Sequence, residues 1–422
     1  MDLPDDYRKL EQQLNGLVKA LPGGLANFSE LRKAAATVTL PTEYFALHEE
    51  LLAIRETSLS MKGFPLMGGL TGTLEPETTT MWLWWRASHE GSVVALDALR
   101  KFVTSNTHDC FARMGVSNFV ADKIYHLQCG LNIFPRKVLG GAPALATMFA
   151  DTVSPHTDSD LGAAGGCMQF LPIDCFWTIK IPIVVEVFGT EEERLKKLHS
   201  QPKAYDTEIK PIVALTMLVP GKEAAFLTAL QLHMDKATPM AAPRWNYLFS
   251  PVALPSSGPS STWNDADIQA LDQLVTQYKR LNSADTARLQ AVLTRAAISA
   301  TATDPVITSA ELRIALEILL CIKGDSRIKS KVAMGVAGVL GTTKSDKEVI
   351  FSDMRSIYKT LSGAVHGGRI DVTPQWSDCI AQGHRYLGRV VRHILSDGKV
   401  PDWKTLRKRD DVRALLTEDE QQ

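Results

Sequence analysis

The sequence has few of the features that mark secreted, metal-binding or membrane-spanning proteins. Its six cysteines are scattered and no two stand in a CxxC spacing, so neither a zinc knuckle nor a thioredoxin-like motif is predicted. The first residues, MDLPDDYRKLEQQL, are polar and lack the apolar core of a signal peptide. No stretch reaches the roughly 18 uninterrupted apolar residues that a membrane span needs. We therefore expect a cytoplasmic protein with reduced thiols and no membrane contact.

An excess of charge of one sign is also missing. Lys and Arg total 46 and Asp and Glu total 47, which gives a net charge of -1. The whole chain is therefore not drawn to nucleic acid or to anionic membranes, although such a sum leaves room for a local basic face. The sequence has no Walker loop, and the glycines between 162 and 166 do not follow a credible strand, so no dinucleotide fingerprint is predicted. We expect no cofactor.

A chain of 422 residues is long enough for two or three domains. The strongest boundary is the segment 250–262, where SPVALPSSGPSS is rich in serine and proline and cannot continue a helix or strand. It separates a mixed region, residues 1–249, which forms one unit or two subdomains, from a helical region at 263–400. A charged tail, residues 401–422, is expected to fray. The predicted fold class is α+β, with a short sheet followed by an all-α bundle.

The mixed region contains both helical and strand-like patterns. Apolar residues at three- and four-residue intervals predict helices at 5–21, 41–57, 90–103, 121–134, 191–198 and 222–234. Two β-branched apolar runs bounded by glycine or proline, 178–189 and 211–221, are typical of buried strands. The segment TTTMWLWWRAS, 78–88, also favours a strand because it is dense in Thr and Trp. Residues 138–169 have no clear period and are interpreted as loops.

The carboxy-terminal region predicts about six helices with short connections. They lie at 264–281, 283–299, 308–322, 326–340, 345–368 and 377–395. Ser283 is a candidate cap, and Thr308 with Glu311 and Ser345 with Glu348 have the spacing of capping boxes. The fourth helix is rich in small residues, so that a neighbouring helix can approach it closely. The fifth is expected to stop at its two terminal glycines.

Three strings in this region, IALEILLC, SKVAMGVAGVL and IYKTLSGAVHGG, resemble consecutive blocks of the Apea-like branch of the HEPN superfamily. The resemblance covers residues 263 to 396, about a third of the chain. It implies an all-α bundle that pairs with a second copy along the helix carrying the final histidine. Active members of the superfamily are metal-independent ribonucleases, and the Apea-like branch is frequent in prokaryotic defence. Their signature is an Arg followed four to six residues later by a His at the end of one helix.

The chemistry explains that pair of residues. When a 2′-hydroxyl attacks the adjacent phosphate, a base must take or orient its proton and a cation must offset the developing charge. By resemblance the histidine is His366, but the position five residues earlier is Leu361, which has neither charge nor donor. Leu361 instead continues the apolar stripe of its helix. We name His366 as the catalytic candidate, with Arg355 as a substitute cation and Tyr358 and Arg369 as RNA-binding candidates.

A substitute arginine meets a geometric difficulty. Arg355 lies eleven residues before His366, about three helical turns and about 16 Å along the axis, too far to share one phosphate within one chain. A partner's Arg355, Arg369 or Arg313 could come closer in a dimer. Two functions therefore remain open. The first is a non-catalytic HEPN-like component that dimerises and binds RNA, or binds a protein partner through the amino-terminal region. The second is a metal-independent ribonuclease with a relocated arginine.

Weaker candidates have simpler explanations. The turn containing His156, Asp158 and Asp160 could ligate a metal, but Asp and Ser favour turns for their own reasons, and we predict no metal site. His108, Asp109 and Cys110 are adjacent, so their side chains point apart.

On a strand, Trp82 and Trp84 would share one face and Trp85 the other, so at least one face is expected to be core rather than a base-stacking surface. Arg389 and His393 have the wrong spacing for the signature and are expected on a solvated face. The run KTLRKRDDVR, 404–413, is expected to be solvated tail.

Overall fold

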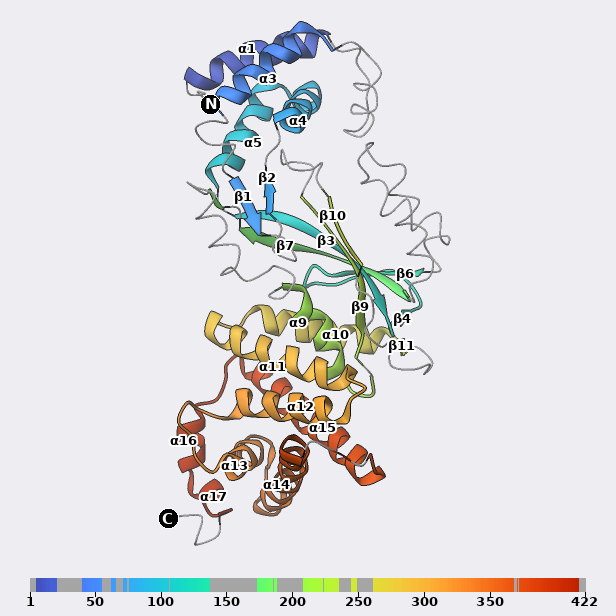
Figure 1. The fold of residues 1–422 in the computed structure, drawn as a ribbon, viewed down its shortest axis with the longest axis vertical. Helices are drawn as coiled ribbons and strands as arrows, with labels where there is room; N and C mark the ends of the chain where they lie inside the picture. The colour runs from blue at the N-terminus through green and yellow to red at the C-terminus, as the bar shows by residue number, and fades with distance from the viewer. Residues whose placement is uncertain are drawn as a thin grey trace.

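The computed structural model describes residues 5–20, 40–54, 62–65, 71–73, 76–105, 107–136, 173–184, 186–187, 208–222, 224–234, 244–248, 261–367, 370 and 372–416. The molecule is elongated, with amino-terminal helices at one end, strands in the middle and a helical bundle with the carboxyl terminus at the other end (Figure 1). The predicted α+β class is confirmed. Among the helices of the described residues, none is both long and apolar enough to span a membrane.

Among the described residues, four helices form the amino-terminal end: α1 (Asp5–Ala20), α3 (Thr42–Ile54), α4 (Pro76–Glu90) and α5 (Ser92–Thr104). The first helix buries Leu10, Leu14 and Leu17, as its apolar stripe predicts. The strand predicted at 78–88 is wrong, because this segment lies within α4. Its side chains are buried almost all round, between α1, α3 and α5, and this packing overrides the β-propensity of Thr and Trp. Trp82 and Trp84 belong to the core.

A six-stranded antiparallel sheet follows, in the order β10-β9-β3-β7-β6-β5. Its members are β3 (Thr107–Ser117), β5 (Tyr125–His126), β6 (Asn132–Pro135), β7 (Cys175–Val184), β9 (Phe226–Met234) and β10 (Arg244–Leu248). A smaller sheet joins β1 (Lys62–Pro65), β2 (Thr71–Thr73) and β8 (Glu186–Val187). The run at 178–189 is thus confirmed as strand. The segments 138–169 and 191–198 lie outside the described residues.

Two predicted helices of the mixed region are strands. The segment 222–234 forms β9, which pairs with β3 on one side and β10 on the other, so its backbone groups are satisfied by distant segments. The segment 121–134 is a short hairpin, β5 to β6, that turns at Gly130 with φ +85°. Asp272 of the bundle accepts hydrogen bonds from the amides of Gln128 and Cys129, both at 2.9 Å. The hairpin therefore depends on a partner far along the chain.

One predicted strand is helical. The run at 211–221 forms α9 (Lys210–Ala214) and the 3-10 turn η5 (Leu215–Leu218). Pro211 lies in the first turn, where its missing amide costs no hydrogen bond. Because nearly every side chain of the segment is buried, the apolar run has no polar face, and periodicity cannot distinguish a buried strand from a buried helix.

The boundary between the mixed region and the bundle contains part of the core. Residues 250–260 of the predicted linker lie outside the described residues. Thr262, which the predicted linker includes, and Trp263 form β11 (Thr262–Trp263), parallel to β4 (Val120–Ala121). The ring of Trp263 is fully buried and stacks on Phe119 at 4.2 Å between centroids. Packing therefore ties the start of the bundle to the sheet region.

The six helices predicted for the bundle are confirmed. They are α10 (Asp265–Lys279), α11 (Ser283–Thr301), α12 (Pro305–Leu320), α13 (Ile328–Leu340), α14 (Lys344–Gly367) and α15 (Pro374–Asp397). Their predicted apolar stripes are buried, including Leu312, Leu316 and Leu319 of α12. The small residues of α13 permit close approach, since a Cβ at Gly338 would meet Leu406 Cδ2 at 2.6 Å.

The predicted caps are displaced. Asn282, rather than Ser283, caps α11 by accepting from the amide of Asp285. Helix α12 begins earlier than predicted, with Asp304 as its cap, and Glu311 pairs with Arg295 at 3.0 Å instead of forming a box with Thr308.

At α14 the reciprocal pair is Thr343 and Asp346, two residues before the predicted pair of Ser345 and Glu348. At each helix start several capping residues (Ser, Thr, Asn or Asp) lie close together in sequence, and the residue at which the helix actually begins becomes the cap.

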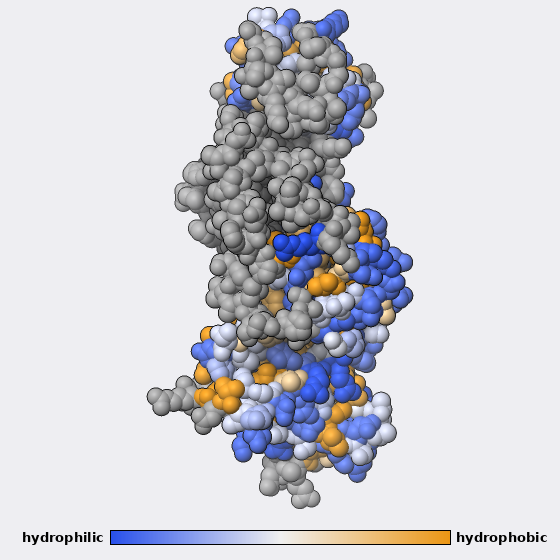
Figure 2. Space-filling view, turned by 90° about the vertical axis from the view of Figure 1, so that its right-hand side faces the viewer, coloured by the Kyte–Doolittle hydropathy of each residue, from blue (hydrophilic) through white to orange (hydrophobic). Residues whose placement is uncertain are grey.

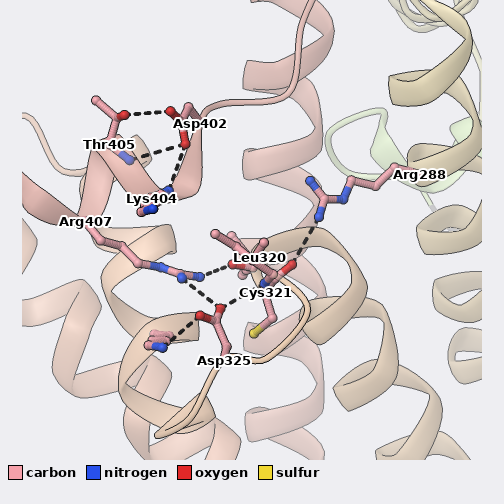
Figure 3. Close-up of polar contacts among 10 residues, drawn as sticks. Arg288, Leu320, Cys321, Asp325, Asp402, Lys404, Thr405 and Arg407 are labelled. Atoms are coloured by element: carbon pink, nitrogen blue, oxygen red, sulfur yellow. Dashed lines mark hydrogen bonds and ion pairs between the residues drawn. The ribbon is translucent and has the colours of Figure 1, made fainter.

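The described part of the predicted charged tail, residues 401–416, is ordered rather than frayed and forms α16 (Trp403–Lys408) and α17 (Asp410–Arg413), which pack on α13. Arg407 is buried, pairs with Asp325 at 2.9 Å and donates to the carbonyl of Leu320 (Figure 3). Burial alone would raise the pKa of Asp325, but hydrogen bonds from Lys331, a backbone amide and Arg407 lower it to about 2. The basic run at 404–413 therefore closes the bundle.

The described surface carries small, separate apolar patches. On the face shown in Figure 2 the bundle is mainly hydrophilic, with patches of apolar residues between charged ones. Isolated apolar residues are ordinary on soluble proteins and do not by themselves define an interface.

Candidate functional site

Leu361, where the family resemblance would place the signature arginine, is a packing position. Leu361 is fully buried in α14, together with Met354 and Ile357 of the same stripe. His366 stands one residue before the end of that helix. The side chain of His366 and the whole of Arg369 lie outside the described residues. Helix α14 therefore supplies no cation at the signature position.

The structure does not bring Arg355 to His366. Its guanidinium lies over the ring of Phe351, 5.5 Å from the centroid, toward the amino-terminal end of α14. The straight helix between the two residues keeps the axial separation of about 16 Å that eleven residues produce. Within one chain, Arg355 therefore cannot contact a phosphate that is held beside His366.

A different arginine lies beside the final turns of α14. Arg313 projects from α12, and its Nε donates to Glu317 Oε1 at 2.7 Å and to the Tyr358 hydroxyl at 3.1 Å. Its Nη1 donates to Ser362 Oγ at 3.4 Å. The Tyr358 hydroxyl in turn donates to Glu317. These four side chains, which we call the Arg313 cluster, join α12 to α14.

The electrostatics of the Arg313 cluster fix its protonation. Burial lowers the pKa of Arg313, but the hydrogen bonds to Glu317 and Tyr358 outweigh this and raise it, so the guanidinium stays charged. Burial, followed by the hydrogen bond to Glu317, raises the pKa of the Tyr358 phenol, so it stays neutral. The cluster therefore holds a permanent cation whose charge Glu317 offsets in part.

The Arg313 cluster lies one helical turn from His366. Ser362 precedes His366 by four residues, which corresponds to about 6 Å along the axis and to nearly the same helix face. The guanidinium of Arg313 therefore reaches the level of α14 that the signature arginine would occupy from position 361. Only the Arg313–Glu317 pair of this cluster could be predicted from the sequence, because the two residues have the i,i+4 spacing of a helical ion pair. The approach of Tyr358 and Ser362 depends on packing between helices.

A shallow depression opens beside this cluster. It has a volume of about 370 Å³ and is lined by Lys329, Tyr358, Lys359, Ser362 and Gly363. In the described part of the chain, neither lysine forms an ion pair. Two unneutralised ammonium groups and a hydroxyl are suited to phosphate oxygens. Tyr358 itself is only 5% exposed and carries Arg313 over its ring at 5.3 Å, so it positions its neighbours and cannot stack on a base.

Of the remaining candidates, none that lies within the described residues forms a second site. The segment with His156, Asp158 and Asp160 lies outside the described residues. Cys110 is buried in β3.

Arg389 lies over the Tyr386 ring and His393 pairs with Asp397 at 3.2 Å, on the solvated side of α15, as predicted. Within the described ranges, no three His, Cys, Asp or Glu side chains are grouped closely enough to hold a metal ion.

Comparison with known proteins adds no relative. The chain matches no protein-family model, no curated protein and no solved structure.

Proposed function

We propose that the carboxy-terminal bundle is a HEPN-like module that binds RNA without cleaving it and pairs with a second copy of the chain. The observation that carries the proposal is the complete burial of Leu361 at the signature position. A leucine packed there leaves the phosphate without the cation that the cleavage step requires. A role in prokaryotic defence follows from the family resemblance alone and is proposed on that basis.

The depression beside the Arg313 cluster supports RNA binding. Lys329 and Lys359 project from different helices, α13 and α14, toward one hollow. Contacts of this kind recognise the phosphate backbone and carry no base specificity. Because Tyr358 is covered, the site favours the backbone of a strand over a stacked base.

The surface of α14 supports pairing with a second copy. Of its five exposed residues from 349 to 363, only Lys359 is charged; the others are Val349, Ser352, Ser356 and Gly363. Small and weakly polar residues at three- and four-residue intervals allow two helices to approach closely along one seam. Contact with a protein partner through the amino-terminal region is proposed from the sequence alone.

RNA binding is tested with the double variant Lys329→Gln/Lys359→Gln in the full chain. We expect weaker binding of single-stranded RNA, with a salt dependence whose log–log slope falls by about 1.4, since each lost phosphate contact accounts for about 0.7. The matched control is Lys323→Gln/Lys344→Gln, two lysines of the bundle that do not line the depression. Equal loss in both variants would show that binding is a general effect of charge.

The Arg313 cluster favours a second candidate function, a metal-independent ribonuclease that uses His366 with Arg313 as the relocated cation. The supporting observation is the 3.4 Å contact of Arg313 with Ser362, one turn before His366. Incubation of the wild-type chain with mixed RNA in EDTA distinguishes the two functions. The non-catalytic proposal expects intact RNA. Cleavage with cyclic-phosphate ends that disappears in both His366→Ala and Arg313→Gln would instead establish the nuclease.

A further inference from the structure

A partly open cavity lies where the sheet region meets the bundle. Its volume is about 170 Å³, and it shares no residue with the depression beside the Arg313 cluster. The walls come from η5, α11 and α15, and in Figure 1 the segment α9–η5 lies between the sheet and α11. Most of the lining is aliphatic, with Leu218, Val292, Leu293 and Leu387 among the contributors. Apolar cavities of about 150 Å³ can remain dry and bind molecules of the size of benzene.

Small residues create this space. Ala296 and Ala300 of α11 and Gly388 of α15 line the cavity where longer side chains would fill it. A Cβ at Gly388 would meet Leu218 at 3.5 Å, an ordinary contact, so the backbone does not require glycine there. Ala300 is exposed and marks a mouth through which a small molecule can enter.

One half-buried polar ring, that of His384, lines the mainly aliphatic walls. His384 Nε2 lies 3.0 Å from Ser299 Oγ, and the Ser299 hydroxyl donates its only hydrogen to the carbonyl of Thr308 at 2.7 Å. Nε2 must therefore carry the hydrogen, which leaves Nδ1 as an unprotonated acceptor. Among the described residues Nδ1 has no partner. Burial lowers the pKa of His384 to about 4, so the ring is neutral at neutral pH.

The other polar side chain of the cavity is already neutralised. Lys222 pairs with Asp267 at 2.7 Å and donates to the carbonyl of Thr262 at 2.5 Å. An anionic ligand would thus compete with a carboxylate that is already bound, and a cationic one would face an ammonium group. The cavity consequently favours an uncharged occupant.

The geometry points to this cavity as a binding site for a small, uncharged, mainly apolar molecule of phenol to indole size that carries one hydroxyl or N–H donor. The donor binds Nδ1 of His384, and the apolar body fills the space that the alanines leave. Nδ1 accepts a hydrogen bond from no described residue, and such a ligand supplies this bond in a mainly apolar surrounding. Because the walls belong to both regions of the chain, the ligand stabilises their contact. The site is independent of RNA binding.

Phenol and toluene provide a matched pair of probes, since they have the same shape and only phenol has a donor. Calorimetric titration of the full chain is expected to show phenol binding about tenfold more tightly than toluene, the factor that corresponds to about 1.4 kcal/mol. His384→Phe should abolish the preference and leave both affinities equal. Ala296→Leu should abolish binding of both by filling the cavity.

Two further variants keep the test decisive. Ala300→Leu narrows the exposed mouth, so it should weaken phenol binding even if Ala296→Leu fails to fold. Ala381→Leu makes the same change on an exposed position of α15 and should leave binding unchanged. Absence of phenol binding at millimolar concentration, equal affinity for phenol and toluene in the wild type, or undiminished binding in Ala300→Leu would each overturn the assignment.

Discussion

The sheet region and the helical bundle satisfy their polar groups in different ways. In the sheet, β3 depends on strands that arrive much later in the chain, since Val116 pairs with Cys175 on one side and Leu227 on the other. In the bundle each helix satisfies its own backbone, and buried side-chain pairs such as Arg407 with Asp325 connect the helices. Disruption of the sheet should therefore spread, whereas disruption of one bundle contact should remain local until a buried charge is left unpaired.

The largest expected effect comes from the residue at which the two regions meet. Trp263→Ala removes a fully buried ring that stacks on Phe119, and we expect a loss of about 4 kcal/mol in the free energy of unfolding. Denaturant unfolding followed by circular dichroism measures it. Phe45→Ala, at a 53% exposed side chain, should change stability by less than about 1 kcal/mol. Similar losses in the two variants would contradict a shared core at the boundary.

The next effect tests the closure of the bundle by its last helices. Arg407→Ala leaves Asp325 and the Leu320 carbonyl without their buried partner, and we expect a loss of about 3 kcal/mol. The matched control is Arg409→Ala, whose ion pair with Asp411 is solvent-exposed and should contribute about 0.5 kcal/mol. If both changes cost the same small amount, the carboxy-terminal helices do not contribute to the stability of the bundle.

A pH titration of stability tests the half-buried His384 of α15. Because the folded pKa of His384 is lowered from 6.5 to about 4, the unfolded chain binds the proton first. The contribution of neutral His384 to the free energy of unfolding is fully present above about pH 6.5 and decreases as the pH drops toward 4. The decrease is at most about 3 kcal/mol, since the cavity leaves the ring partly accessible.

His384→Phe should flatten this part of the profile. The aspartates whose pKa is lowered to about 2, Asp325 and Asp411, lose most of their contribution below about pH 4, so they affect mainly the acid end of the window. An unchanged slope in the variant would refute the assignment.

The smallest expected loss of stability shows which of two neighbouring residues, Asn282 or Ser283, caps α11. Asn282 accepts from the amide of Asp285, so Asn282→Ala should cost about 1 kcal/mol. Ser283→Ala, one residue later and inside the helix, should have almost no effect. Thermal unfolding of the two variants provides the comparison. A greater loss for Ser283→Ala would place the cap where the sequence pattern alone predicts it.

The sequence determined most of the bundle, because a helix makes its hydrogen bonds within four residues and its packing appears as a local apolar period. That is why the six bundle helices, the buried stripe of α12 and the packing role of Leu361 could be predicted. The capping residues could not be predicted, because Ser, Thr, Asn and Asp lie close together at helix starts and the local pattern does not identify which of them caps the helix.

Only the tertiary structure decided the rest. The strand at 222–234, the helices at 78–88 and 211–221, and the docked helices after residue 401 all depend on partners from distant parts of the chain. The same holds for the Arg313 cluster, where a pair visible in sequence acquires Tyr358 and Ser362 from another helix. The physical reason is that strand pairing and side-chain convergence between helices are satisfied by residues remote in sequence, which no local period encodes.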